Sequence, residues 1–249
     1  MRRKPQVLSP EKITCLNCGD RYTGSFCNSC GQAAAVEPFT IRSFGMEFFR
    51  NIRKFDITTT FFTFVELLAE PGEFVRAFLA GKRVGFISPF KFYINAMLVQ
   101  VIFLSFLRNL TTDEAFSPGL AGDPWVQFFG LVSTIFWGIF WALFYRGSLK
   151  GVAEYAACSL YFSGQNIFLG TLIVISTSPL REGLPLTGTF ILPVQMIVMA
   201  GYSFYFAKEL FQEPWWKVLL KQAGLFLIYV ILLSAMVLAY GTWLNRVGQ

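Results

Sequence analysis

The sequence predicts an all-α polytopic membrane protein with about five transmembrane helices, preceded by a small N-terminal zinc-ribbon module. Three observations lead to this prediction. Hydrophobic residues make up 54% of the 249 residues and charged residues only 14%, whereas a soluble domain carries about 25% charged residues. The hydrophobic residues form long blocks, without the alternating polarity of a membrane β-barrel. Four cysteines near the N-terminus form two closely spaced pairs.

The predicted ribbon occupies residues 1–36 and contains the stretch CLNCGDRYTGSFCNSCGQ. Its spacing is C-x2-C-x8-C-x2-C, and the four ligands would be Cys15, Cys18, Cys27 and Cys30. A glycine follows each pair, as a tight metal-binding turn with positive φ requires. Two such turns facing each other predict a closed four-cysteine site that holds one structural Zn²⁺.

Other roles for these cysteines are less compatible with the sequence. Disulfides need an oxidising compartment, whereas the charge distribution described below places the segment in the cytoplasm. A catalytic zinc keeps a ligand position open, and the chain has no His to serve as base or ligand. Iron in a rubredoxin-like site uses similar turns and stays open as an alternative. Cys158 is expected to be a buried apolar side chain.

Residues 37–89 mix aromatic and basic residues and predict amphipathic helices next to the membrane. An apolar stretch breaks at Pro71-Gly72, and a second helix over Glu73–Ala80 is expected to present an apolar face. That face comprises Phe74, Val75, Phe78 and Leu79. The cations expected to reach lipid headgroups or a partner are Arg76, Lys82 and Arg83. The helix can equally pack on the cytoplasmic end of the helical bundle. No nucleic-acid-binding module is recognisable, and no nucleic acid is expected as a partner.

Residues 90–249 form the predicted transmembrane domain, because they contain five apolar runs of about 20 residues, the length that crosses a bilayer as a helix. The runs are Phe90–Leu107, Trp125–Tyr145, Val152–Ile175, Thr187–Ala207 and Ala223–Leu244.

The distribution of basic residues predicts the orientation. Eighteen of the 21 Lys and Arg residues fall on the side of the N-terminus, if all five runs cross. By the positive-inside rule, the N-terminus is cytoplasmic and the C-terminus lies outside. We expect a bacterial inner-membrane protein whose basic residues meet anionic headgroups.

The centres of the five runs contain no charged residue. The polar residues that remain are the amides Asn95, Gln100, Gln165, Asn166 and Gln195. They can line a polar cavity, or they can form hydrogen bonds between helices, which is the simpler interpretation.

The chain resembles an uncharacterised bacterial membrane-protein family that has an N-terminal zinc ribbon. The resemblance rests on CLNCG, FCNSCGQ and the stretch FDITTTFFTFVELLAEPGEFVRAFLAGKRVGFISPFKFY. The elements that carry it are Pro71, Gly72, Arg76, Gly81, Lys82, Arg83, Pro89 and Phe90. It implies a cytoplasmic ribbon joined to a membrane bundle. The activity of that family is unknown, so the resemblance supplies no catalytic residues. Five spans with a cytoplasmic N-terminus are also similar in topology to the Yip family of trafficking proteins.

No nucleophile–base pair, phosphate-binding loop or pair of carboxylates stands at a useful spacing. We therefore expect a non-catalytic accessory or assembly subunit, whose ribbon contacts other membrane or cytoplasmic subunits or the membrane surface. A small-molecule or lipid transporter that uses the mid-span amides is the alternative. A lipid-modifying membrane enzyme is the second alternative.

Overall fold

The computed structural model describes residues 12–34, 57–110, 124–177 and 191–247. The described chain is mostly helical, which confirms the predicted fold class at that level. Several predicted features lie outside these residues: residues 1–11 and 35–56, the start of the fourth apolar run at Thr187, and the acidic and basic residues of 111–123 and 178–190.

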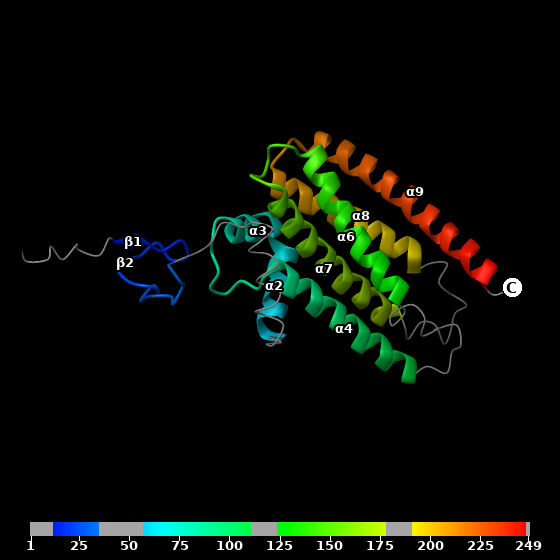
Figure 1. Cartoon of the computed structure of the whole chain (residues 1–249), viewed down its shortest axis with the longest axis horizontal. Coiled ribbons are helices and arrows are strands. Elements are labelled where there is room, and N and C mark those ends of the chain that lie inside the picture. The colour runs from blue at the N-terminus through cyan, green and yellow to red at the C-terminus, as the bar shows by residue number, and fades with distance from the viewer. Residues whose placement is uncertain (1–11, 35–56, 111–123, 178–190, 248–249) are drawn as a thin grey trace, which may run out of the picture.

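The N-terminal module is a small pair of β-turn units (Figure 1). Strands β1 (Ile13–Thr14) and β2 (Arg21–Tyr22) pair antiparallel, with Ile13 opposite Tyr22. An isolated antiparallel bridge joins Phe26 to Ala33 in the second unit. Each unit therefore folds back on itself around one cysteine pair.

Two short helices follow, α2 (Ile57–Ala69) and α3 (Pro71–Leu79). The predicted break is present but falls at Glu70, and α3 begins at Pro71 rather than at Glu73 and ends at Leu79 rather than at Ala80. Pro71 lacks an N–H and is suited to the first turn of the new helix. Helix α3 buries Phe74, Val75 and Phe78, three residues of its predicted apolar face. Both helices pack against the long helices, because α2 contacts α4 and α7 while α3 contacts α8.

Five long helices form the rest of the described chain. They are α4 (Pro89–Leu110), α6 (Pro124–Phe144), α7 (Val152–Thr177), α8 (Ile191–Phe211) and α9 (Trp215–Val247). They lie side by side and alternate in direction along the bundle (Figure 1). Helix α7 contacts α4, α6 and α8, and α9 packs on α6 and α8. The ribbon lies near the end of the bundle at which α7 and α9 begin.

Each predicted apolar run lies largely on one of these helices, with differences at the ends. Helix α9 begins at Trp215, eight residues before the predicted apolar run. The run was placed from Ala223 because the first two turns of the helix contain Lys217 and Lys221 and are therefore not apolar. Pro214 immediately precedes this helix and accepts hydrogen bonds from its first free N–H groups, at Lys217 and Val218.

Aromatic side chains fill the core between α6, α7 and α8. Trp141 is fully buried and stacks on Phe206, with ring centroids 5.4 Å apart. Phe162 lies parallel to Tyr202 at 5.9 Å. Trp137, one turn before Trp141, is also buried, so the aromatic pair of α6 faces other helices.

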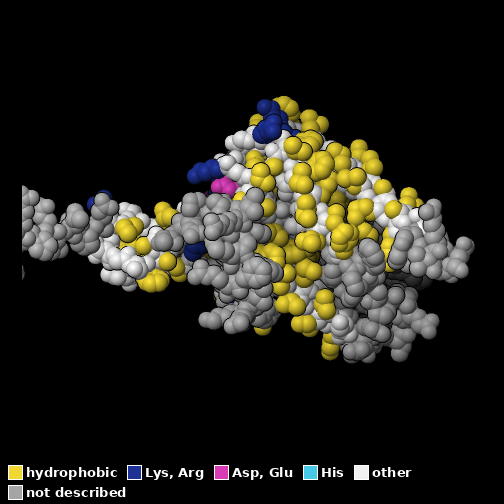
Figure 2. Space-filling model, viewed as in Figure 1, with side chains coloured by type: hydrophobic (Ala, Val, Ile, Leu, Met, Phe, Trp, Pro, Cys, Tyr) yellow, Lys and Arg dark blue, Asp and Glu magenta, His cyan; other side chains and the backbone are white. Residues whose placement is uncertain are grey.

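Two of the helices are long and apolar enough to cross a membrane over described residues: Val152–Ser176 within α7 and Trp215–Thr242 within α9. The apolar segments described in α4 and α6, Pro89–Phe103 and Phe128–Phe144, are shorter. Hydrophobic side chains cover much of the described face of the bundle (Figure 2). Lys and Arg side chains gather where α6 ends and α9 begins.

Candidate metal centre

Two matching turns carry the four cysteines. In the first, the N–H of Gly19 donates to the carbonyl of Cys15 at 3.0 Å; in the second, Gly31 donates to Cys27 at 2.8 Å. Gly19 has φ +80° and Gly31 φ +75°, a conformation that side chains disfavour. The predicted role of both glycines is therefore confirmed.

The four sulfur atoms converge on one point. All four Sγ atoms lie within 4.8 Å of one another. Cys15 and Cys30 are 3.5 Å apart at sulfur, as are Cys18 and Cys27. A tetrahedral ion with metal–sulfur bonds of about 2.3 Å places its ligands about 3.8 Å apart. The arrangement therefore fits a metal ion held by four thiolates, as the spacing predicted, and none of the cysteines forms a disulfide.

The thiols differ in acidity. A hydrogen bond from the main chain of Cys18, helped by one from Asn17, lowers the pKa of Cys15 to about 6. For Cys18, a main-chain hydrogen bond from Asp20 is outweighed by desolvation and the neighbouring sulfurs, and its pKa rises to about 12. These shifts favour ionisation of Cys15 before Cys18. A metal ion must displace the remaining protons, so binding weakens as the pH falls.

The ribbon has very little apolar core of its own. Within residues 12–34, the buried hydrophobic side chains are Cys15, Tyr22 and Cys27, with Cys30 and Ala34 packed beside them. A unit of this size buries too little surface to offset its conformational entropy. The metal must supply most of its folding free energy.

The three predicted surface cations have different environments. Arg76 donates to the main-chain carbonyls of Glu209 and, at 3.3 Å, of Leu210, so it caps the end of α8. Arg83 donates to the carbonyls of Phe78 and Lys82 at the end of α3. Lys82 is exposed. Arg76 and Arg83 therefore hold helix ends in place, in line with the alternative in which this segment packs on the bundle.

The amides at mid-helix lie at several helix contacts. Gln165 is fully buried and donates to the carbonyl of Phe64 in α2 at 3.0 Å. Asn95, also buried, donates to the hydroxyl of Thr60 in α2 at 2.7 Å. Asn166 donates to the carbonyl of Phe162 within α7. Both bonds to α2 match the predicted role of amides as links between helices.

The remaining two amides lie elsewhere. Gln195 of α8 lies against Gly170 of α7, so that a Cβ added to Gly170 would collide with the Nε2 atom of Gln195. Gln100 is half-buried on α4. Gln165 also keeps one buried oxygen, Oε1, without a hydrogen-bond partner among the described residues.

Two functional features escaped the sequence prediction. Gln32 closes the second cysteine turn and reaches the turn after α3, although in the sequence it is only the last residue of FCNSCGQ. Gly72 allows α3 to touch the end of α8, because a Cβ there would overlap the main chain of Glu209. The sequence did contain a signal for this contact: Gly72 and Arg76 are one helical turn apart, so both face the same side of α3 and can meet the same helix end.

These observations define the class of protein: a helical chain with two candidate membrane-spanning helices and a four-cysteine metal-binding cluster over the described residues. The profile of the DUF3667 family, described as a protein of unknown function, matches residues 60–101. The matched segment contains the elements from Pro71 to Phe90 on which the resemblance rests, but not the cysteines. No curated protein and no solved structure matches the chain. The likeness to the Yip family stays a prediction.

Proposed function

We propose that this protein is a non-catalytic accessory or assembly subunit of the bacterial inner membrane, and that its cytoplasmic zinc ribbon binds a partner protein or the membrane surface. In this proposal all five long helices cross the membrane. The ion is structural, since four thiolates leave no open position for a water molecule. Its folding role favours zinc over iron, because zinc has no redox chemistry.

The apolar outer surface of the bundle supports a position in lipid. Ile135, Ile139 and Leu143 follow one another at helical spacing on α6 and are each more than half exposed. Leu227 and Ile231 are likewise more than half exposed on α9, which packs on α6. A contiguous apolar surface of this kind needs a cover, which acyl chains provide.

The cations support the predicted orientation. Arg146, Lys150, Lys208 and Lys217 are exposed close to the ends of α6 to α9 that face the ribbon. Lys221 pairs with Glu213 at 2.6 Å near the same end. These positions suit the cytoplasmic headgroup layer, where anionic lipids attract Lys and Arg.

The observation that carries the contact role is the pair of large apolar side chains on the outside of the ribbon. Leu16 is 54% exposed and Phe26 is 63% exposed. Each adjoins a metal-ligand cysteine, so the ion fixes its position. Aromatic and aliphatic side chains held rigidly at a surface are the usual anchors of protein interfaces. We therefore expect the partner to be a protein with an apolar pocket.

The test is recovery of the partner from the native host. The full chain is purified in nanodiscs, and co-purifying proteins are quantified by mass spectrometry. The double variant Leu16→Ser/Phe26→Ser should lose its specific partner at least about tenfold, the effect of removing an interface anchor. Zinc content should not change. The matched control is Asn28→Ala/Ser29→Ala, which changes two exposed polar residues of the same ribbon.

A second variant addresses transport. Alanine at Gln165, Asn166 and Gln195 together should leave partner recovery nearly intact. If this amide variant abolishes the activity of the protein in its host and the Leu16/Phe26 variant does not, the working site lies in the membrane. The transporter or enzyme interpretation would then replace ours.

A further inference from the structure

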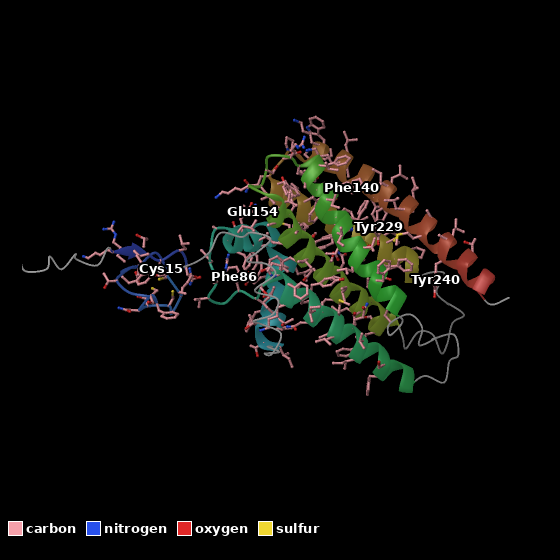
Figure 3. The ribbon with its side chains drawn as sticks, viewed as in Figure 1. Cys15, Phe86, Phe140, Glu154, Tyr229 and Tyr240 are labelled. Atoms are coloured by element: carbon pink, nitrogen blue, oxygen red, sulfur yellow. The ribbon has the colours of Figure 1, made fainter. Side chains whose placement is uncertain are left out.

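A buried carboxamide joins the ribbon to the helical part of the chain. Gln32 is only 4% exposed. Its Nε2 donates to the carbonyl of Gly81 at 3.1 Å, and its Oε1 accepts from the N–H of Arg83 at 3.0 Å. The side chain thus offers the same donor and acceptor as a peptide group. Figure 3 shows Phe86, just beyond this turn, on the side of the helices that faces the ribbon with Cys15.

The second cysteine turn fixes the position of Gln32. Its main-chain carbonyl accepts from the N–H of Cys27 at 2.8 Å, and Gly31 donates to the carbonyl of Cys27. Gln32 is therefore held in the loop that contains Cys27 and Cys30. Because the ribbon has so small a core, this loop keeps its closed form only while an ion holds the cysteines together.

The receiving turn is held from the other side, independently of the ribbon. Gly81 has φ +104°, and its N–H donates to the carbonyl of Phe78 at 3.0 Å. The Arg83 guanidinium lies over the Phe78 ring, 4.1 Å from its centroid, and donates to main-chain carbonyls there. Arg76 ties α3 to α8. The Gly81 carbonyl and the Arg83 N–H are thus preformed for a partner.

We propose that Gln32 is a metal-dependent latch: an ion at the four cysteines orders Gln32, and Gln32 docks the ribbon on the turn Gly81–Arg83. With the metal bound, the ribbon is fixed at the end of the bundle. Without it, the two hydrogen bonds from Gln32 to this turn are lost. Metal occupancy thereby decides whether the ribbon is docked on this turn. This inference requires a metal at the cysteines, but it does not depend on the identity of any partner.

The test is hydrogen exchange of the full chain in nanodiscs, followed at the peptide that contains the amide of Arg83. In Gln32→Ala, the zinc content should stay at the wild-type level while exchange at this peptide becomes about tenfold faster, as expected for the loss of two hydrogen bonds. Gln32→Glu keeps the acceptor for the Arg83 N–H but loses the donor to the Gly81 carbonyl, so its exchange should lie between those of the wild type and Gln32→Ala. Treating the wild type with a zinc chelator should speed hydrogen exchange at the same peptide by a factor similar to that in Gln32→Ala.

The matched control is Asn28→Ala, a change to an exposed amide of the same cysteine turn, which should leave exchange at Arg83 unchanged. Chelation should add nothing at this peptide in Gln32→Ala, because the latch is already open. Three results would overturn the proposal. The first is unchanged exchange at the Arg83 peptide in zinc-loaded Gln32→Ala. The others are a chelator that speeds exchange in the ribbon of the wild type but not at the Arg83 peptide, or one that still speeds exchange at the Arg83 peptide about tenfold in Gln32→Ala. Peptides of α7 report whether each variant keeps its bundle.

Discussion

At the scale of single residues, the cysteines separate into two groups with different chemistry. Cys15, Cys18, Cys27 and Cys30 share one small volume, in which the pKa of Cys15 is lowered and that of Cys18 is raised. Cys158 is fully buried in α7, and desolvation by the surrounding side chains suits it to packing alone. The same residue type is thus a metal ligand in the ribbon and a small hydrophobic side chain in the bundle.

This contrast gives a matched pair of substitutions. Cys27→Ser should reduce bound zinc from about one equivalent per chain to a small fraction, because a hydroxyl replaces one of four thiolates in a site whose binding energy is folding energy. Limited proteolysis should then cut within the ribbon and leave the helices intact. Elemental analysis of purified protein measures the metal.

Cys158→Ser is the control and should retain its zinc. Less than half an equivalent of zinc in the wild type, or iron in its place, would contradict the zinc assignment. Equal metal loss in both variants would show that the ribbon is not the site.

At the scale of elements, α3 is clamped to the end of α8. Gly72 brings the two main chains together, and Arg76 satisfies carbonyls that the end of α8 leaves without helical partners. Tyr205 of α8 donates to the carbonyl of Ala69, and Tyr202 to that of Leu67 at 2.9 Å, so the end of α2 is held in the same way. The break between α2 and α3 is therefore bound to one helix on both sides.

Gly72→Ala should separate α3 from α8 and destabilise the protein by about 1–3 kcal/mol, the usual cost of overpacking. The matched control is Gly224→Ala in α9, where a Cβ meets no atom within 4 Å. That change should be neutral or stabilise by about 0.5–1 kcal/mol, since alanine favours a helix. Thermal unfolding in one detergent measures both. Similar midpoints for the two variants would disprove the close contact at Gly72.

The sequence predicted local features well and contacts between distant segments poorly. The cysteine spacing was sufficient for the metal cluster, because two residues between ligands and a following glycine define the turn locally. The long apolar runs likewise indicated the helices, since their length follows from bilayer thickness. The pairing of Gln32 with Gly81 and Arg83, by contrast, joins positions 49 and 51 residues apart. Arg76 was assigned to headgroups because a single sequence does not show that the end of α8 lies beside it.

At the scale of the whole molecule, the odd number of long helices in the described chain decides where the two ends of the bundle point. The helices alternate in direction, so the ribbon and the last turn of α9 lie toward opposite ends (Figure 1). If all five cross the membrane, these two ends face different compartments. The ribbon then shares its compartment with the exposed cations at the start of α9.

Reporter fusions test this orientation. A reporter that works only outside the cytoplasm should be active after Gln249 and inactive when inserted after Gly147, in the exposed turn between α6 and α7. A reporter that works only inside should show the reverse pattern. Because the positive-inside rule predicts both positions from the same charges, equal activity at both would mean that a span has been miscounted. Equal activity would place the error among α7, α8 and α9, which separate the two positions, whereas a miscounted first span, α4, would exchange the two activities.

The length of α9 has a consequence for the bilayer itself. A helix of 33 residues is about 50 Å long, whereas the hydrocarbon layer is about 30 Å thick. If α9 crosses the membrane with Lys217 and Lys221 among the headgroups, the rest of the helix still exceeds the hydrocarbon thickness. An excess of this size is taken up by tilting, by local thickening of the lipid, or by extension beyond the far surface. If α9 crosses the membrane, its tilt should therefore decrease as the acyl chains lengthen.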